Sequence, residues 1–171
     1  MIAITLVGFL AAINLAAGSS QNETPTLTPC PGESDPILVI QNITIMNAEL
    51  GKKVKLKADI QVTAPLDSDP TLYVSFSRPN GTELACPDYI SNCVLKLCGG
   101  TKIDEILLNR DWDNKCPIEP GTYTAMVAVR INDDEEAEEF IGDGNLVVKL
   151  LIENGGSTAD CVSFPVYVEK D

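Results

Sequence analysis

Six cysteines are the residues whose type and spacing suggest chemistry, and three of them, Cys86, Cys93 and Cys98, lie within one short stretch. Cysteines can bind zinc, act as nucleophiles or pair as disulfides. The chain has no histidine, and its cysteine spacings do not form paired C-x-x-C knuckles, so zinc is the weaker alternative. An even number of cysteines in an exported chain is typical of a disulfide framework, which here would contain three bridges.

The same composition argues against catalysis. Without histidine, the chain cannot activate a nucleophile through an imidazole. Paired carboxylates are the remaining enzymatic alternative, yet no pair stands out among the 25 Asp and Glu residues. The sequence therefore predicts a non-catalytic protein that uses no metal and no cofactor.

The N-terminus predicts export. Residues 1–18 form a short apolar run ending in A-A-G, which suits signal-peptidase cleavage, although no Lys or Arg precedes the run. An N-terminal membrane anchor is the alternative, but the run is short for a span. N-glycosylation motifs at Asn22, Asn42 and Asn80 agree with export. We expect a secreted, extracellular or lysosomal protein.

The chain is strongly acidic, with a net charge of −13 and a sequence pI of about 4.3. No basic patch is visible, which argues against a nucleic-acid partner. Such a chain also repels anionic membranes at neutral pH. Protonation of carboxylates in an acidic compartment would reduce that repulsion.

The spacing of apolar residues predicts an all-β chain. Residues 54–62 alternate apolar and polar side chains without a break, which is typical of a strand with one buried face. A phase change near Gln41 indicates a bulge, and residues 103–108 can form a short helical turn. The expected strands cover residues 37–46, 54–62, 72–77, 121–131, 145–153 and 161–169.

These short strands, separated by turn signals such as N-G and G-G, favour an immunoglobulin-like β-sandwich of two antiparallel sheets. Residues 19–29, rich in Thr and Pro, are expected to be a flexible lead-in. The folded domain would then cover residues 30–171. Trp112 is expected to act as a lid over the core, with a ligand platform as the alternative.

Four patches resemble the ganglioside activator family within the ML lipid-recognition superfamily, to which the Niemann–Pick type C sterol carrier also belongs. Residues 86–93 have the form C-x-D-Y-I-x-x-C, with Cys98 shortly after. Residues 116–123 have the form C-P-x-x-x-G-T-Y. The pairs Asp35-Pro36 and Gly144-Asn145 each lead into a strand. Order and spacing agree from Cys30 to the C-terminus.

The resemblance implies a β-cup whose two sheets are splayed and enclose an apolar cavity for acyl chains. This chain lacks a further cysteine pair of the vertebrate activator, and its loop at residues 110–115 is shorter. The bridges that the resemblance implies are Cys30–Cys161, Cys86–Cys93 and Cys98–Cys116.

Apolar alternation gives the side chains expected to line such a cavity. The face of the strand at 121–131 that meets the interior stays open at this point, because both faces carry apolar residues. The candidate lipid-binding residues are Leu56, Ile60, Leu72, Val74, Phe76, Tyr123, Val127, Leu146, Val148 and Leu150.

Residues 133–139 are an acidic run, expected to be a solvated loop, since the spacing of an EF-hand is missing and calcium is only weakly indicated. Phe140 and Ile141 follow the run. In the activator family, an aromatic residue beside a leucine at this place helps membrane docking, so both are candidates for a membrane-contact loop. The alternative is that Phe140 packs back into the core.

The resulting hypothesis is a lipid-binding or lipid-transfer protein that holds acyl chains of a glycolipid, phospholipid or sterol. It would present this cargo to a membrane, which it contacts transiently, or to a lipid hydrolase. The alternative is a structural or adhesive extracellular sandwich with a filled core that acts through its surface.

Overall fold

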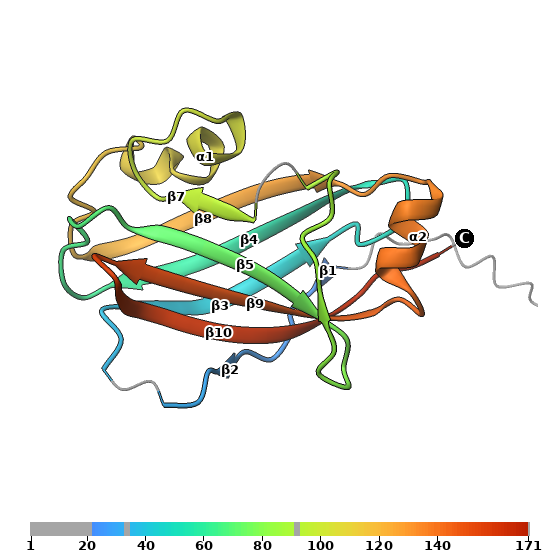
Figure 1. Cartoon of the computed structure of the whole chain (residues 1–171). Helices are drawn as coiled ribbons and strands as arrows, with labels where there is room; N and C mark the ends of the chain where they lie inside the picture. Colours follow the sequence, from blue (N-terminus) through green and yellow to red (C-terminus); the bar gives the residue numbers. More distant parts are fainter. Residues whose placement is uncertain (1–21, 33–34, 91–92, 171) are drawn as a thin grey trace, which may run out of the picture.

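The computed structural model describes residues 22–32, 35–90 and 93–170, and it shows two antiparallel sheets packed face to face (Figure 1). The first sheet has the order β1-β3-β4-β8. Its strands are β1 (Asn22–Glu23), β3 (Leu38–Met46), β4 (Lys53–Val62) and β8 (Gly121–Arg130).

The second sheet has the order β2-β10-β9-β5-β6, and β7 also pairs with β5. The all-β sandwich predicted from the sequence is therefore confirmed. The strands of this sheet are β2 (Thr28–Pro29), β5 (Thr71–Ser77), β6 (Glu83–Leu84), β7 (Val94–Lys96), β9 (Asn145–Asn154) and β10 (Ser157–Tyr167).

Strand β4 shows why the sequence forms a half-buried sheet. Val54, Ile60 and Val62 are buried on its inner face, whereas Lys55 and Gln61 are exposed on the other. β-branched residues pack well on such a pleated surface, and the alternation fixes which face turns inward.

The bulge expected near Gln41 is present. The register of β3 against β4 shifts between Ile40 and Asn42. A second irregularity lies in β10 between Thr158 and Asp160. An extra residue reverses the side-chain alternation after it, so it decides which residues of the strand turn inward.

The lead-in differs from the prediction of a flexible segment. Asn22 and Glu23 pair with β3, and Thr28 and Pro29 pair with β10, so this segment extends both sheets. Backbone pairing with an available sheet edge explains the order of these polar residues. The predicted signal peptide at residues 1–18 lies outside the described residues.

In the described part of the chain, three short helical segments connect the strands: α1 (Ile103–Leu108), η1 (Arg110–Trp112) and α2 (Glu135–Ile141). The expected helical turn at α1 is confirmed. The acidic run is solvated as expected, but it is a helix rather than a loop. The Asp134 side chain caps the helix by accepting a hydrogen bond from Ala137 N at 2.9 Å. The carboxylates in the first turn stabilise the helix through their favourable interaction with its dipole.

Three disulfides connect these elements, and they are the pairs that the resemblance implied. The bridges are Cys30–Cys161, Cys86–Cys93 and Cys98–Cys116.

Among the described residues, no helix has the length and apolar character needed to cross a bilayer. No cluster of acidic, cysteine or histidine side chains among them could hold a metal ion.

Candidate functional site

A cavity of about 410 Å³ lies between the two sheets, and its walls are almost entirely apolar. This volume is in the range of about 300–1,000 Å³ found for small-molecule binding sites. The charged residues among those that line it are Asp104 and Arg130. The cavity therefore fits an apolar guest better than a charged one.

The structure brings all ten predicted cavity residues together around this space. It also settles which face of β8 turns inward, since Tyr123, Ala125 and Val127 line the cavity while Met126 is 43% exposed on the opposite face. The predicted residues that line the cavity are Leu56, Ile60, Leu72, Val74, Phe76, Tyr123, Val127, Leu146, Val148 and Leu150.

The centre of the inner face is incompletely covered. Leu56 pairs with Val127 across β4 and β8, and Val74 pairs with Leu150 across β5 and β9. All four side chains line the cavity, yet they are only half-buried. In a sealed sandwich, inner-face residues at the middle of the strands would be fully buried. The two sheets therefore leave an accessible apolar space between them.

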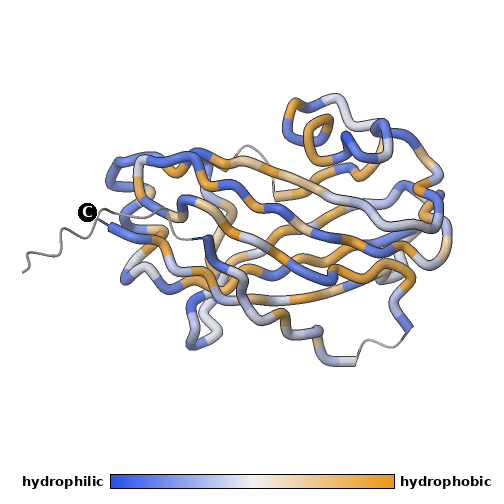
Figure 2. Tube along the Cα trace, turned by 180° about the vertical axis from the view of Figure 1, so that it is seen from behind, coloured by the Kyte–Doolittle hydropathy of each residue, from blue (hydrophilic) through white to orange (hydrophobic). Residues whose placement is uncertain are grey.

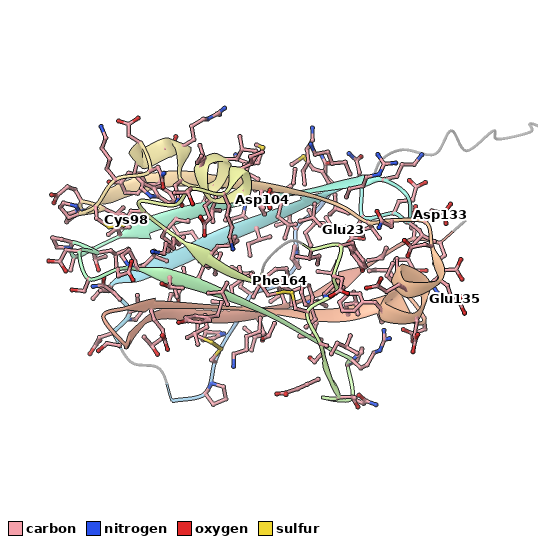
Figure 3. The ribbon with its side chains drawn as sticks, turned by 45° about the horizontal axis from the view of Figure 1, so that its top comes forward. Glu23, Cys98, Asp104, Asp133, Glu135 and Phe164 are labelled. Atoms are coloured by element: carbon pink, nitrogen blue, oxygen red, sulfur yellow. A yellow bond between two sulfur atoms is a disulfide. The ribbon has the colours of Figure 1, made fainter. Side chains whose placement is uncertain are left out.

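Helix α1 forms one wall of the cavity and bridges the sheets, because it packs against β8 of one sheet and β7 of the other. Its residues Asp104 and Leu108, one helical turn apart, line the cavity. Asp104 is half-buried, so the cavity wall meets solvent at this helix. Figure 3 shows Asp104 on this short helical segment, with Cys98 close to it.

Glu105 fixes α1 to the end of β7. Its carboxylate, on a residue only 4% exposed, accepts hydrogen bonds from Lys96 N at 3.1 Å, Thr101 N at 3.1 Å and Lys102 N at 3.2 Å. Burial alone would raise the pKa of Glu105, but these three N–H groups and the Lys102 charge outweigh burial and lower it. A Cβ at Gly100 would lie 2.5 Å from the Cβ of Glu105, so this packing requires glycine there.

Trp112 of η1 covers the cavity beside α1, as expected for a lid. Its ring contacts the ring of Tyr123 edge-on, with 5.8 Å between centroids. The Trp112 indole N–H donates to Leu97 O, and the Tyr123 hydroxyl donates to Glu119 O at 2.7 Å. Both polar groups are thus satisfied by the backbone, which leaves the aromatic surfaces to the cavity.

Phe140 and Ile141, the predicted membrane-contact residues, turn inward instead of forming an exposed tip. Ile141 is 1% exposed, and both residues line the cavity. The Phe140 ring meets Phe76 edge-on at 5.3 Å and Tyr89 at 6.1 Å. This arrangement is the alternative that the sequence left open, in which Phe140 packs back into the core, because helix formation turns both side chains inward. Membrane contact by this segment stays a prediction.

Arg78 holds the C-terminal end of α2 in this position. Its guanidinium donates to Ile141 O at 2.6 Å and to Glu139 O at 3.0 Å. These carbonyls belong to the last turn of the helix, where backbone acceptors have no partner within the helix. The contact therefore holds Phe140 and Ile141 at the end of the cavity.

Residues 88–89, in the loop closed by the disulfide Cys86–Cys93, contact α2. Asp88 N donates to Glu136 Oε1 at 3.3 Å, and Tyr89 contacts Phe140. Burial, followed by the charges of Glu136 and Asp134, raises the pKa of Tyr89 to about 12. Tyr89 therefore stays a neutral aromatic side chain that lines the cavity.

Asp160 is a structural residue that sequence reasoning missed. It is 5% exposed, and its Oδ2 accepts a hydrogen bond from Ile40 N at 2.8 Å, which connects β10 to the bulged part of β3. Burial raises the pKa of Asp160, and hydrogen bonds from Ile40 N and Cys161 N offset this in part. A signal for such a residue is an acidic position inside an otherwise apolar strand.

The three glycosylation candidates differ in accessibility. Asn22 is exposed on β1, and Asn80 is exposed in the turn after β5, where its Oδ1 accepts a hydrogen bond from Thr82 N at 2.9 Å. Asn42 is half-buried on β3. Their modification stays a prediction.

Comparisons with known proteins returned distant structural likenesses. No protein-family model and no curated protein matches the chain. The C-terminal domain of wzt is 12% identical, with a TM-score of 0.49, covering 86% of this chain and 79% of that one. A Niemann-Pick type C2 protein from Japanese carpenter ant is 11% identical, with a TM-score of 0.46, covering 89% of this chain and 96% of that one.

The chain is an all-β cup of two antiparallel sheets. Both likenesses have TM-scores below 0.5.

Proposed function

We propose that this protein binds lipid by holding acyl chains in the cavity between its sheets. The observation that carries the proposal is the accessible apolar space of about 410 Å³, with half-buried aliphatic side chains at its centre. Such a space is stable when it is small and dry or when an apolar guest fills it. A filled structural sandwich, the alternative function, would have no such space.

Hydrophobic transfer supplies the expected affinity. Each methylene group moved from water into the cavity contributes about 0.8 kcal/mol. The indole N–H of Trp112 and the hydroxyl of Tyr123 already donate hydrogen bonds to backbone carbonyls, so neither group is available to a lipid headgroup. The charged lining residues, Asp104 and Arg130, are half-buried and exposed respectively. The cargo is therefore expected to keep its headgroup at the rim.

This mode of binding suits a carrier rather than an enzyme. The proposed cargo is a glycolipid, phospholipid or sterol, which the protein would present to a membrane or a lipid hydrolase. No resident cofactor is needed for this role. The disulfides agree with a secreted or lysosomal location, because such bridges persist in oxidising compartments.

Titration with the fluorescent fatty acid cis-parinaric acid tests the proposal. Ala58 is half-buried and lines the cavity, so Ala58→Phe should fill part of the space and weaken binding at least tenfold. Ala85→Phe, at an exposed alanine outside the cavity lining, is the matched control and should bind as the wild type does. Equal affinity of Ala58→Phe and wild type, or no binding by the wild type, would contradict the proposal.

Native mass spectrometry of protein purified from its own source complements the titration. A co-purifying lipid would identify the class of cargo. A protein that is free of lipid and also fails to bind cis-parinaric acid would favour the structural or adhesive alternative.

A further inference from the structure

Helix α1 exposes three large aliphatic side chains to solvent. Ile103 is 75% exposed, Leu107 51% and Ile106 47%. Their spacing of i, i+3 and i+4 places them on one face of the helix. The aliphatic face of a surface helix normally packs against the core and its polar face meets solvent. In α1 an aliphatic face meets solvent instead.

The opposite face of the same helix belongs to the cavity wall. Asp104 and Leu108 line the cavity, and the buried Glu105 carboxylate holds the helix in place. Figure 2 shows apolar residues of this helical segment in orange at the periphery, apart from the strands of the two sheets. A helix of six residues thus separates an apolar outer surface from an apolar interior.

Basic side chains flank the apolar outer face. Lys102 precedes the helix and Arg110 follows it, and both are exposed. Residues 94–116 hold four of the 12 basic residues of the chain, and of their four acidic residues Glu105 is buried and Asp104 lines the cavity. The outward charge at α1 is therefore far less negative than the average of a chain with net charge −13.

The α2 end has the opposite character. Residues 133–143 contain seven carboxylates and no basic residue, and these carboxylates outnumber the two basic side chains that contact the segment, Arg78 and Lys170. The apolar side chains of Phe140 and Ile141 point into the cavity. In Figure 3 the labelled Asp133 and Glu135 lie at this end, far along the sandwich from Asp104. An anionic surface would be repelled here and accepted at α1.

We infer that α1 is the surface through which this protein docks on an anionic lipid membrane. Ile103, Ile106 and Leu107 enter the interface between headgroups and acyl chains, and Lys102 and Arg110 contact lipid phosphates. An apolar face with basic residues beside it is the pattern of helices that lie in a membrane interface. The inference rests on the proposed function, because α1 forms one wall of the cavity and a lipid that leaves the bilayer beside this helix would enter there.

The helix is short, which fits a transient contact. Three aliphatic side chains bury little area compared with a membrane anchor, so docking depends on the basic residues as well. Because the phosphate contacts are exposed, salt screens them. Binding should therefore weaken with rising ionic strength and with falling content of anionic lipid.

Vesicle flotation tests the inference, using vesicles of phosphatidylcholine with and without phosphatidylserine. The variant Ile103→Ser, Ile106→Ser, Leu107→Ser should lose at least tenfold in vesicle binding. The variant Lys102→Glu, Arg110→Glu should lose binding mainly to the vesicles with phosphatidylserine. The control Met126→Ser, Tyr167→Ser removes two apolar side chains that are 43% and 48% exposed elsewhere, and it should stay within twofold of wild type.

Binding of cis-parinaric acid without vesicles separates this inference from the proposed function. The α1 variants should keep wild-type affinity for the free fatty acid. A wild type that binds the fatty acid but no vesicle overturns the docking surface and leaves the cavity function standing. A wild type that binds vesicles but no fatty acid contradicts the cavity function instead.

Two further outcomes would overturn the inference. One is vesicle binding by the aliphatic triple variant at the wild-type level. The other is a wild type that forms dimers dispersed by the same triple variant while binding no vesicle, which would assign the α1 face to contact between two copies of the chain. Sedimentation velocity distinguishes these states, and a thermal melt confirms that each variant is folded.

Discussion

The two long edges of the sandwich are closed by different means. At one edge, β3 and β10 contact each other directly, Asp160 accepts a hydrogen bond from Ile40 N, and the bridge Cys30–Cys161 ties the first residues of the domain to β10. At the other edge, α1 is inserted between β8 and β7, and the bridge Cys98–Cys116 encloses it.

This difference explains why the molecule has a cavity. Direct contact between strands brings the inner faces together, whereas an inserted helix acts as a spacer and keeps them apart. Each edge contains one buried carboxylate, and the two differ in pKa. Burial raises the pKa of Asp160, although the carboxylate accepts hydrogen bonds from Ile40 N and Cys161 N. Three backbone N–H groups outweigh burial at Glu105 and lower its pKa. The carboxylate of the inserted edge is therefore the more fully hydrogen-bonded of the two.

The largest effect is expected at the direct-contact edge, for Cys30→Ser with Cys161→Ser. The bridge spans 131 residues, and the loop-entropy relation gives a loss of about 5 kcal/mol in the free energy of unfolding. Urea denaturation of the purified variant measures it. A loss below about 1 kcal/mol would show that this edge is held without the bridge.

Removal of the bridge at the inserted edge, by Cys98→Ser with Cys116→Ser, should lower the free energy of unfolding less than removal of Cys30–Cys161. It should lower the affinity for lipid more. The bridge spans 18 residues, for which the same relation gives about 3 kcal/mol. Because α1 walls the cavity, affinity for cis-parinaric acid should fall further than in the variant without Cys30–Cys161. Equal losses of affinity in the two variants would contradict the distinction between the edges.

Glu105→Gln should lower the free energy of unfolding by about 2 kcal/mol at pH 7, because an amide cannot accept from all three N–H groups. The folded-state pKa of Glu105 is lowered, so its stabilising effect is present above the ordinary value of about 4.3 and is lost as pH falls through the lowered pKa. The difference between wild type and variant should shrink in acid. A difference that grows in acid would refute this assignment.

Asp160→Asn should have the smallest effect at pH 7, less than about 1 kcal/mol, since the lost hydrogen bond is offset by removal of a buried charge. The folded-state pKa of Asp160 is raised, so wild type gains stability as pH falls through that pKa toward the ordinary value of about 3.9. The variant should lack this gain. Parallel pH profiles of the two proteins in thermal melts would show that Asp160 does not titrate as inferred.

Regular parts of the fold follow from the sequence, because their signals are local. The unbroken alternation of residues 54–62 predicts β4 and its inner face, and the phase change near Gln41 predicts the bulge. The bridges followed from the cysteine motifs of a family, since six cysteines alone allow 15 pairings. The cavity lining then follows from the alternation once the two inner faces are known.

The missed features depend on contacts between distant segments. The bulge at residues 158–160 turns Asp160 inward, and its partner Ile40 lies 120 positions away. The acidic run gives no apolar periodicity, so its helix depends on the Asp134 cap and on Phe140 packing against Phe76. Glu105 carried a local signal, because a glutamate at the third helical position often accepts from the N-cap N–H.

The most direct test of the cavity account is a crystal structure of the protein with a fatty acid brominated along its chain. The anomalous signal of bromine locates the acyl chain without relying on the lipid density. The account predicts bromine between the two sheets, in contact with Leu56, Val74 or Leu150, with α1 still separating β7 from β8. Bromine found only on the outer surface, or sheets closed against each other without guest, would contradict it.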